Sequence, residues 1–368
     1  MMIKPLNVLA LMSGTSIDAI KYALISTDGV DIYREYLTGS IPFPEFLRTK
    51  IELISGKNIN NPDDKVLIET VENDVTKMMR DIISEVIGSN TQKIDLIGIE
   101  GPTITHDAKA SYTYQLGKGQ VIFDTFKIPV VSHFHNADIA NGGQGAPLTA
   151  TYYHALAQHL EKPALFINIG GVSSLTYIGS LGEMLAFDCG PANAMLNHFM
   201  KKHAHVAMDY NGQRAALGQV HTKIVNGLMK HEFFEMLPPK ALDLNAFKDK
   251  EEHFEGLSIE DGAATIVDFI AVSIQKAVQT LLPSKPESVM ICGGGALNPT
   301  LVRNLKQKLK ADGINAFVSH DEVKPNDASA FAFLTARRFY HLPITFPSTT
   351  GVSAPMTGGK LYDKEEEK

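Results

Sequence analysis

The sequence predicts an α/β protein built from two duplicated lobes, and three observations lead to this prediction. A chain of 368 residues exceeds the size at which one hydrophobic core stops growing, so two domains are expected. Two distant segments share one pattern, in which an apolar strand, a turn with glycine and a second strand follow one another. After each of them, a further apolar strand ends abruptly at glycine. This matched order implies two related halves with a cleft between them.

The first pattern starts at Leu9. An apolar strand ends in the turn Ser-Gly-Thr-Ser-Ile-Asp at 13–18, and a second strand is expected at 22–26. Glycine lets backbone approach a ligand, hydroxyl and backbone N–H groups donate hydrogen bonds, and a carboxylate can hold a divalent ion or its water. We interpret the turn as a hairpin that binds the phosphates of a nucleoside triphosphate. An ordinary hairpin turn explains this segment alone equally well.

The second pattern covers 164–177 and turns at Gly170-Gly171, and the strands that end at glycine cover 94–99 and 289–292. This layout resembles the actin, hexokinase and Hsp70 superfamily, whose related ribonuclease H-like lobes present opposed hairpins to the phosphates of ATP. We expect an N-terminal lobe at 1–133, a C-terminal lobe at 134–368 and an ATP cleft between them. A fold resemblance alone leaves the function open.

Apolar residues at helical spacing, with capping residues or proline ahead of them, predict the helices between these strands. The expected ranges are 61–87, 146–159, 192–200, 258–282 and 298–310.

Composition indicates a soluble enzyme of the cytoplasm. Hydrophobic residues make up 44% of the chain and charged residues 20%, which suits packed cores. The net charge of −7 argues against a nucleic-acid partner, which needs a basic face. Cys189 and Cys292 are the only cysteines, so no disulfide framework is expected. No segment has the roughly 18 to 20 apolar residues that a membrane span needs, and the N-terminal apolar run is too short for a secretion signal.

Seven motifs identify a family. They occur in the order found in anhydro-N-acetylmuramic acid kinases: Gly14-Thr-Ser-Ile-Asp, Asp138-Ile-Ala-Asn-Gly-Gly-Gln-Gly-Ala-Pro-Leu148, Asn168-Ile-Gly-Gly, Phe187-Asp-Cys-Gly-Pro-Ala-Asn193, Pro238-Pro-Lys240, Asp261-Gly-Ala-Ala-Thr265 and Cys292-Gly-Gly-Gly-Ala-Leu-Asn-Pro299. The chain resembles this family over nearly its whole length. The resemblance implies an enzyme of cell-wall recycling that uses ATP and Mg²⁺, opens the 1,6-anhydro ring of the murein sugar with water and phosphorylates O6. It also suggests a homodimer.

Asp188 is the expected catalytic residue. Ring opening needs a base that activates water at the anomeric carbon, while the freed O6 attacks the γ-phosphate. Asp188 follows an apolar strand and stands on a turn before Gly190, where a rigid strand can aim its carboxylate into a cleft. The resemblance gives it the role of general base. A capping role for the helix at 192–200 is the alternative, and both roles are compatible.

The resemblance also assigns the ligand-binding residues. Those for the nucleotide are Gly14, Thr15, Ser16, Ile17, Asp18, Ala19, Ile20, Lys21, Gly170, Gly171, Gly293, Gly294 and Gly295. Asp18 is the expected ligand of Mg²⁺. The glycines allow phosphate or ribose to approach backbone N–H groups, which a Cβ would hold away. Those for the sugar are Thr103, His135, Gln144, Asn193 and Asp327.

The predicted sugar pocket departs from the family pattern. The family motif Ser-His-Gly-Gln-Thr is replaced here by Ile99-Glu-Gly-Pro-Thr103, and His135 stands at the position of an arginine, the residue best suited to bind a lactyl carboxylate. Lys21 replaces an acidic residue and Asp327 a glutamate. His133 and His135 alternate along an expected strand, and together with His106 they suit a pocket lining or an interface better than a zinc site.

These departures leave two alternatives open beside the kinase of the muramyl sugar. One is a kinase of another anhydro sugar that lacks the lactyl group. The other is a nucleotide-gated sugar-binding protein without catalysis, against which the retained Asp188 and Asp18 argue.

Overall fold

The computed structural model describes residues 4–14, 17–242, 244–319 and 325–364. The chain forms two compact units. Unit 1 contains residues 1–155 together with 326–368, and unit 2 contains residues 156–325. This division differs from the expected lobes at 1–133 and 134–368. The reason is that the C-terminal segment returns to the first sheet, where it adds both a helix and an edge strand.

Unit 1 is built on a six-stranded sheet with the order β13-β7-β4-β1-β2-β3. Its strands are β1 (Leu6–Met12), β2 (Ala19–Thr27), β3 (Ile32–Pro42), β4 (Leu96–Glu100), β7 (Val130–Ser132) and β13 (Lys360–Tyr362). The first three strands are antiparallel neighbours, whereas β4 runs parallel to β1 and β7 parallel to β4. A separate hairpin pairs β5 (Thr103–Asp107) with β6 (Tyr112–Gln115).

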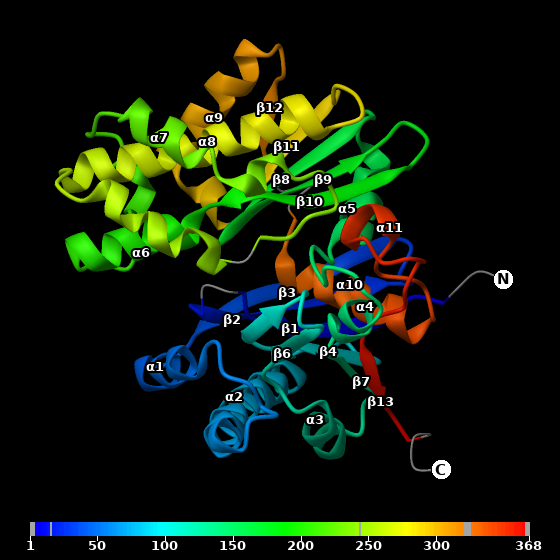
Figure 1. The fold of residues 1–368 in the computed structure, drawn as a ribbon. Helices are drawn as coiled ribbons and strands as arrows, with labels where there is room; N and C mark the ends of the chain where they lie inside the picture. The colour runs from blue at the N-terminus through cyan, green and yellow to red at the C-terminus, as the bar shows by residue number, and fades with distance from the viewer. Residues whose placement is uncertain (1–3, 15–16, 243, 320–324, 365–368) are drawn as a thin grey trace. The chain divides into compact units, whose positions relative to one another are not determined.

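Helices cover both faces of this sheet (Figure 1). They are α1 (Glu45–Ile54), α2 (Pro62–Ser89), α3 (Gly119–Phe126), α4 (Asn136–Ala140), α5 (Ala150–Leu156), α10 (Asp327–Phe339) and α11 (Pro347–Thr350). Leu9 and Leu11 of β1 pack with α1, α2 and α3 in one core. The opposite face contacts α10, and at Gly98 of β4 the two approach so closely that a Cβ would lie 2.1 Å from Thr335 Oγ1.

Unit 2 repeats the topology of unit 1 in a five-stranded sheet with the order β10-β9-β8-β11-β12. Its strands are β8 (Ala164–Ile169), β9 (Val172–Ile178), β10 (Met184–Pro191), β11 (Ser288–Cys292) and β12 (Ala316–Val318). The first three are again antiparallel, and β11 and β12 continue parallel to β8. The predicted duplication is therefore confirmed strand by strand, because β8 to β12 correspond to β1, β2, β3, β4 and β7.

The helices of unit 2 pack with the sheet in one large hydrophobic core. They are α6 (Asn193–Ala204), α7 (Thr222–Leu228), α8 (Ile259–Leu281) and α9 (Pro299–Ala311), with short 3₁₀ segments at 157–159, 210–212, 232–235, 244–254 and 294–297. The α8 and α9 helices lie side by side (Figure 1). None of the helices in the described ranges is both long and apolar enough to cross a membrane.

Four of the five predicted helices are confirmed within a few residues. Asn61, Ser258 and Asn298 cap α2, α8 and α9 through their side chains, as the capping pattern predicts. The expected helix at 146–159 starts later, at Ala150, and the backbone at 144–145 ahead of it bonds to side chains elsewhere in unit 1.

Candidate active site

The β1–β2 hairpin of unit 1 is the expected phosphate hairpin. Ser13 donates its backbone N–H to the Glu100 carbonyl (2.9 Å), which joins the start of the turn to the end of β4. At the other end Asp18 is exposed, and one carboxylate oxygen accepts the N–H of Ala19 (2.9 Å). Ile17 is half-buried with a φ of 51°, and Ala19 and Ile20 are buried at the start of β2. Gly14 is half-buried, while Thr15 and Ser16 lie outside the described residues.

Lys21 of β2 forms an ion pair with Asp327, the first residue of α10. Lys21 Nζ lies 3.0 Å from Asp327 Oδ2, and each side chain is about one-third exposed, at 37% and 34%. Burial lowers the pKa of Lys21, but the carboxylates of Asp327 and Asp18 outweigh this effect and raise it. The ammonium therefore stays protonated at neutral pH. A residue predicted for the nucleotide and one predicted for the sugar are thus direct partners.

The backbone N–H and carbonyl groups of Gln144 and Gly145 all have hydrogen-bond partners. Gln144 donates its N–H to the Thr350 carbonyl (2.7 Å), and its own carbonyl lies 2.9 Å from His106 Nε2. Gly145 donates its N–H to Asp138 Oδ1 (2.7 Å), and its carbonyl lies 2.6 Å from His135 Nδ1. The position of the Gln144 backbone is therefore fixed within unit 1.

His135 also contacts Glu100, so two departures from the family pattern are partners in the structure. His135 Nε2 lies 2.9 Å from Glu100 Oε1, although no described residue gives either carboxylate oxygen a well-aligned hydrogen bond. The Gly145 carbonyl can only accept, so Nδ1 carries a proton. Burial lowers the pKa of His135, but Glu100, the Gly145 carbonyl and Asp138 together outweigh burial and raise it. A histidine in contact with a carboxylate therefore stands where the family has an arginine.

The histidines do not alternate along a strand, contrary to the expectation. The β7 strand ends at Ser132, His133 adopts a left-handed φ of 55°, and His135 is the cap residue of α4. Both ring nitrogens of His106 face protein oxygens, those of Thr113 and Gln144. Within the described ranges no group of three or more His, Cys, Asp or Glu residues could hold a metal ion. Thr103 of β5 accepts a hydrogen bond from Gln115 (3.2 Å).

Asp188 lies near the end of β10 in unit 2, where the ladder with β9 has a bulge between Asp188 and Gly190. Such bulges redirect side chains. The segment at 240–242 holds the residue: Asp188 donates its N–H to the Lys240 carbonyl (2.9 Å), and Leu242 donates its N–H to Asp188 Oδ2 (2.8 Å). No described residue donates to Oδ1. Asp188 does not cap α6, whose cap residue is Ala192.

The environment of Asp188 favours the neutral carboxyl. Burial raises its pKa to about 7, against the opposing effects of the Leu242 N–H and the Lys240 charge. Lys240 is itself only 2% exposed, and its ammonium donates to the Phe233 carbonyl (2.8 Å) while lying over the Phe233 ring. Burial lowers the pKa of Lys240. A buried carboxyl with one open oxygen and a pKa near neutrality suits a general base.

The second hairpin turn and the start of α6 form one bonded structure. The carbonyls of Gly170 and Gly171 accept the first backbone N–H groups of α6, including that of Asn193 (3.1 Å). The Asn193 side chain reaches back to the Ile169 carbonyl (3.2 Å). The N-terminal donors of α6 are therefore used within the protein, and Asn193 is fixed beside the turn.

The three glycines of the turn at 293–295 differ in their surroundings: two are closely packed, and one is exposed. A Cβ on Gly293, whose φ is 80°, would lie 2.3 Å from Asn168 Oδ1, and one on Gly295 would lie 2.3 Å from Ile169. These two glycines allow the turn to pack on the end of β8. Gly294 is exposed, and only the Asn193 amide, at 3.7 Å, would come near its Cβ. Gly294 is thus the position that offers open space to a ligand.

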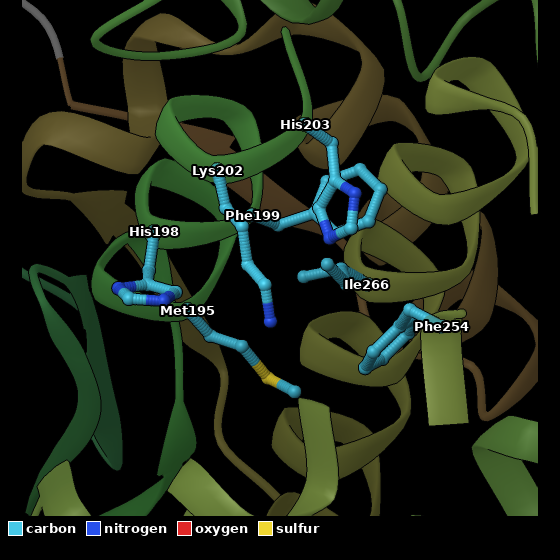
Figure 2. Close-up of a pocket in the computed structure, with 7 residues that line it drawn as sticks. All are labelled: Met195, His198, Phe199, Lys202, His203, Phe254 and Ile266. Atoms are coloured by element: carbon cyan, nitrogen blue, oxygen red, sulfur yellow. The ribbon is translucent and has the colours of Figure 1, made fainter. Parts of the chain in front are cut away.

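Two hollows lie on unit 2. The larger has a volume of about 250 Å³ and lies beside α9, which follows the 293–295 turn; it is lined by Ala215, Ala216, Gly218, Val220, Ala264, Val267, Thr300, Arg303, Asn304 and Gln307. The smaller, between α6, α8 and Phe254, is shown in Figure 2. Its volume of about 10 Å³ holds no more than one water molecule, so it is not a ligand site.

The structure also assigns contacts to residues for which the sequence indicated no role. The Asp138 carboxylate holds the Gly145 backbone, the Thr350 carbonyl holds that of Gln144, and the Lys240 carbonyl accepts the Asp188 N–H. Asp138 and Lys240 lie inside the quoted motifs, so the motifs contained a signal for them. Thr350 lies outside every motif.

Repeated lobes of this topology, each with a glycine-containing hairpin after its first strand, are the α/β fold of the actin, hexokinase and Hsp70 class. The sequence comparisons narrow this class. The family model for anhydro-N-acetylmuramic acid kinase matches residues 6–364. The chain belongs to the anhydro-N-acetylmuramic acid kinase family.

Curated relatives align with this chain over nearly its full length and nearly their own. Proteins named anhydro-N-acetylmuramic acid kinase are 37% identical in Rhodopseudomonas palustris, where 97% of this chain and 99% of the relative align, and 34% identical in Zymomonas mobilis, where 96% and 99% align. A relative of the same name from Acidiphilium cryptum is 35% identical over 97% of this chain and 98% of its own length. Among solved structures, the activator of 2-hydroxyisocaproyl-CoA dehydratase from Clostridium difficile covers 91% of this chain and 96% of its own, with 13% identity and a TM-score of 0.43, too distant to carry an argument.

Proposed function

We propose that this protein converts 1,6-anhydro-N-acetylmuramic acid, ATP and water into N-acetylmuramate 6-phosphate and ADP. Membership of the kinase family supports the reaction type. The observation that carries the proposal for this chain is the state of Asp188, a buried carboxyl at a strand bulge with one oxygen held and the other open.

Asp188 acts as general base in this proposal. Its Oδ2 is fixed by the Leu242 N–H, which leaves Oδ1 to accept a proton from the water that attacks the anomeric carbon. A base is most effective when its pKa lies near the working pH, and burial raises the pKa of Asp188 to about 7. Lys240 offsets part of the burial effect and so keeps the carboxylate available at neutral pH.

The proposed nucleotide site consists of accessible residues in the glycine-containing turns. Gly294 offers open space beside Asn193, and exposed Asp18 provides one carboxylate, which is enough for Mg²⁺ because this ion keeps waters and binds substrate phosphates. Bound Mg²⁺ and ATP supply charge neutralisation and the phosphoryl group. Gly14, Thr15, Ser16, Gly170 and Gly171 would hold the phosphates. The cavity beside α9 combines small apolar side chains with Arg303, Asn304 and Gln307, and we place the adenine base there.

The sugar site is proposed at Thr103, His135, Gln144, Asn193 and Asp327. The fixed Gln144 backbone supports a role for this amide in orienting the sugar. We further propose a cytoplasmic location and a homodimer, which the family resemblance suggests.

The test is ADP release by the purified protein with Mg·ATP and 1,6-anhydro-N-acetylmuramic acid, compared with 1,6-anhydro-N-acetylglucosamine, which lacks the lactyl carboxylate. We expect turnover of the muramyl sugar. Asp188→Asn should lower kcat by about 10² or more, because a positioned base contributes that much. In the wild type kcat/KM should fall about tenfold per pH unit below pH 7, since Asp188 that is protonated in the free protein cannot accept a proton.

Three outcomes would contradict parts of this proposal. Turnover of the carboxylate-free sugar alone would identify a kinase of a different anhydro sugar. Nucleotide and sugar binding without ADP release would identify a binding protein. An Asp188→Asn variant with wild-type turnover would remove Asp188 from the role of base.

A further inference from the structure

The Lys21–Asp327 ion pair joins two residues with different expected ligands. Lys21 lies on β2, three residues after Asp18 of the phosphate hairpin, and Asp327 begins α10. Their contact of 3.0 Å crosses unit 1 between segments 306 residues apart. The side-chain exposures of 37% and 34% leave both groups within reach of a small molecule.

The chemistry of the pair permits an exchange of partners. An ammonium group has three N–H donors, and Asp327 accepts one of those of Lys21. Exposed carboxylate–lysine pairs are weak because water and salt compete with them. A phosphate group carries more charge and more acceptor oxygens than a carboxylate, so it competes strongly for the same ammonium.

We propose that Lys21 exchanges Asp327 for a phosphate of the nucleoside triphosphate, and that this exchange frees the Asp327 carboxylate to accept a hydrogen bond from a sugar hydroxyl. This inference rests on the proposed function. Lys21 is then a phosphate-binding residue, and Asp327 competes with the nucleotide until the nucleotide is bound. Because linkage is reciprocal, nucleotide and sugar must strengthen each other's binding.

The competing explanation is a structural tether, in which the ion pair only fastens α10 to β2. The two explanations predict different changes in nucleotide affinity when either partner is removed. If the pair is a tether, removing either partner disturbs the hairpin in the same way. If the partners exchange, removing Lys21 weakens nucleotide binding, whereas neutralising Asp327 strengthens it because Lys21 no longer has a competing acceptor.

The experiment is calorimetric titration of the full chain with Mg·AMP-PNP in the absence of sugar. We expect Lys21→Met to raise Kd about tenfold, as for the loss of one charge-assisted hydrogen bond. Asp327→Asn should lower Kd several-fold, and the double variant should match Lys21→Met. The matched control is Lys50→Met with Asp74→Asn, an ion pair of 2.9 Å and similar exposure between α1 and α2, which should leave Kd unchanged.

A second titration adds 1,6-anhydro-N-acetylmuramic acid with and without nucleotide. Nucleotide should tighten sugar binding in the wild type and not in Lys21→Met. An unchanged or raised Kd for Mg·AMP-PNP in Asp327→Asn would overturn the exchange, as would equal weakening in both single variants. Nucleotide binding that follows the predicted signs, without ADP release from any sugar, would refute the proposed function alone; absence of nucleotide binding by the wild type would refute both.

Discussion

Asp188 connects activity and stability at the scale of a single residue. The same burial that keeps its pKa near 7 makes its charged form unfavourable in the folded protein. In the unfolded chain this carboxyl ionises at its ordinary pKa of 3.8. Because the folded pKa is the higher one, the contribution of Asp188 to stability is most favourable below pH 3.8 and is lost as the pH rises from about 4 to 7. The burial that suits Asp188 to its proposed role as base therefore destabilises the folded protein at neutral pH.

Asp188→Asn should for this reason stabilise the inactive protein at high pH. The difference between about 7 and 3.8 corresponds to at most about 4 kcal/mol at pH 8, at 1.36 kcal/mol per pKa unit. The amide oxygen can still accept the Leu242 N–H, so no hydrogen bond is lost. Thermal unfolding of both proteins at pH 8 and pH 5 measures the effect. A variant less stable than the wild type at pH 8, or an equal difference at both pH values, would contradict the assignment.

At the scale of elements, the packing of α10 on β4 depends on Gly98. A Cβ at this position would lie 2.1 Å from Thr335 Oγ1 and 3.2 Å from Thr335 Cβ. Gly98→Ala should therefore cost about 1–3 kcal/mol by overpacking. Thr335→Ala should restore part of this loss in the double variant, because the hydroxyl bonds only to its own helix at Phe331. Denaturant unfolding of both single variants and the double variant measures the coupling; strictly additive losses would show that the contact is not what limits position 98.

The sequence predicted the elements whose signals are local. Both hairpins, and the helices begun by Asn61, Ser258 and Asn298, follow from patterns within a few residues. The start of α5 could not be predicted in this way. Side chains of His106, His135 and Asp138 bind the backbone at 144–145, and nothing near Pro147 indicates those distant partners.

Prediction of the candidate site was likewise limited to signals that are local in the sequence. Asp188 could be proposed from the sequence because a strand, a turn and a motif coincide on it, whereas the contact of Glu100 with His135 joins two positions that the sequence showed only as separate departures. The partnership of Lys21 with Asp327 was equally hidden by a separation of 306 residues.

At the scale of the whole molecule, unit 2 is one continuous segment and unit 1 is not. The core of unit 2 lies entirely between Leu165 and Ala316, whereas the core of unit 1 includes Tyr362, and its sheet needs α10 on one face. A fragment of residues 156–325 should therefore unfold cooperatively on its own, and a fragment of residues 1–155 should not. Circular dichroism during heating tests both fragments. A cooperative transition in the 1–155 fragment would show that the C-terminal segment is dispensable for unit 1.

The β1 strand, early in the sequence, and the α10 helix, late in the sequence, both belong to unit 1, and this constrains the order in which unit 1 can fold during synthesis. The ribosome releases β1 first, yet the face of β1 that receives α10 stays uncovered until residues 327–339 have emerged. The middle of the chain completes its own core before then. During translation the sheet of unit 1, although made first, is therefore covered last, and its apolar face is open to aggregation in the interval.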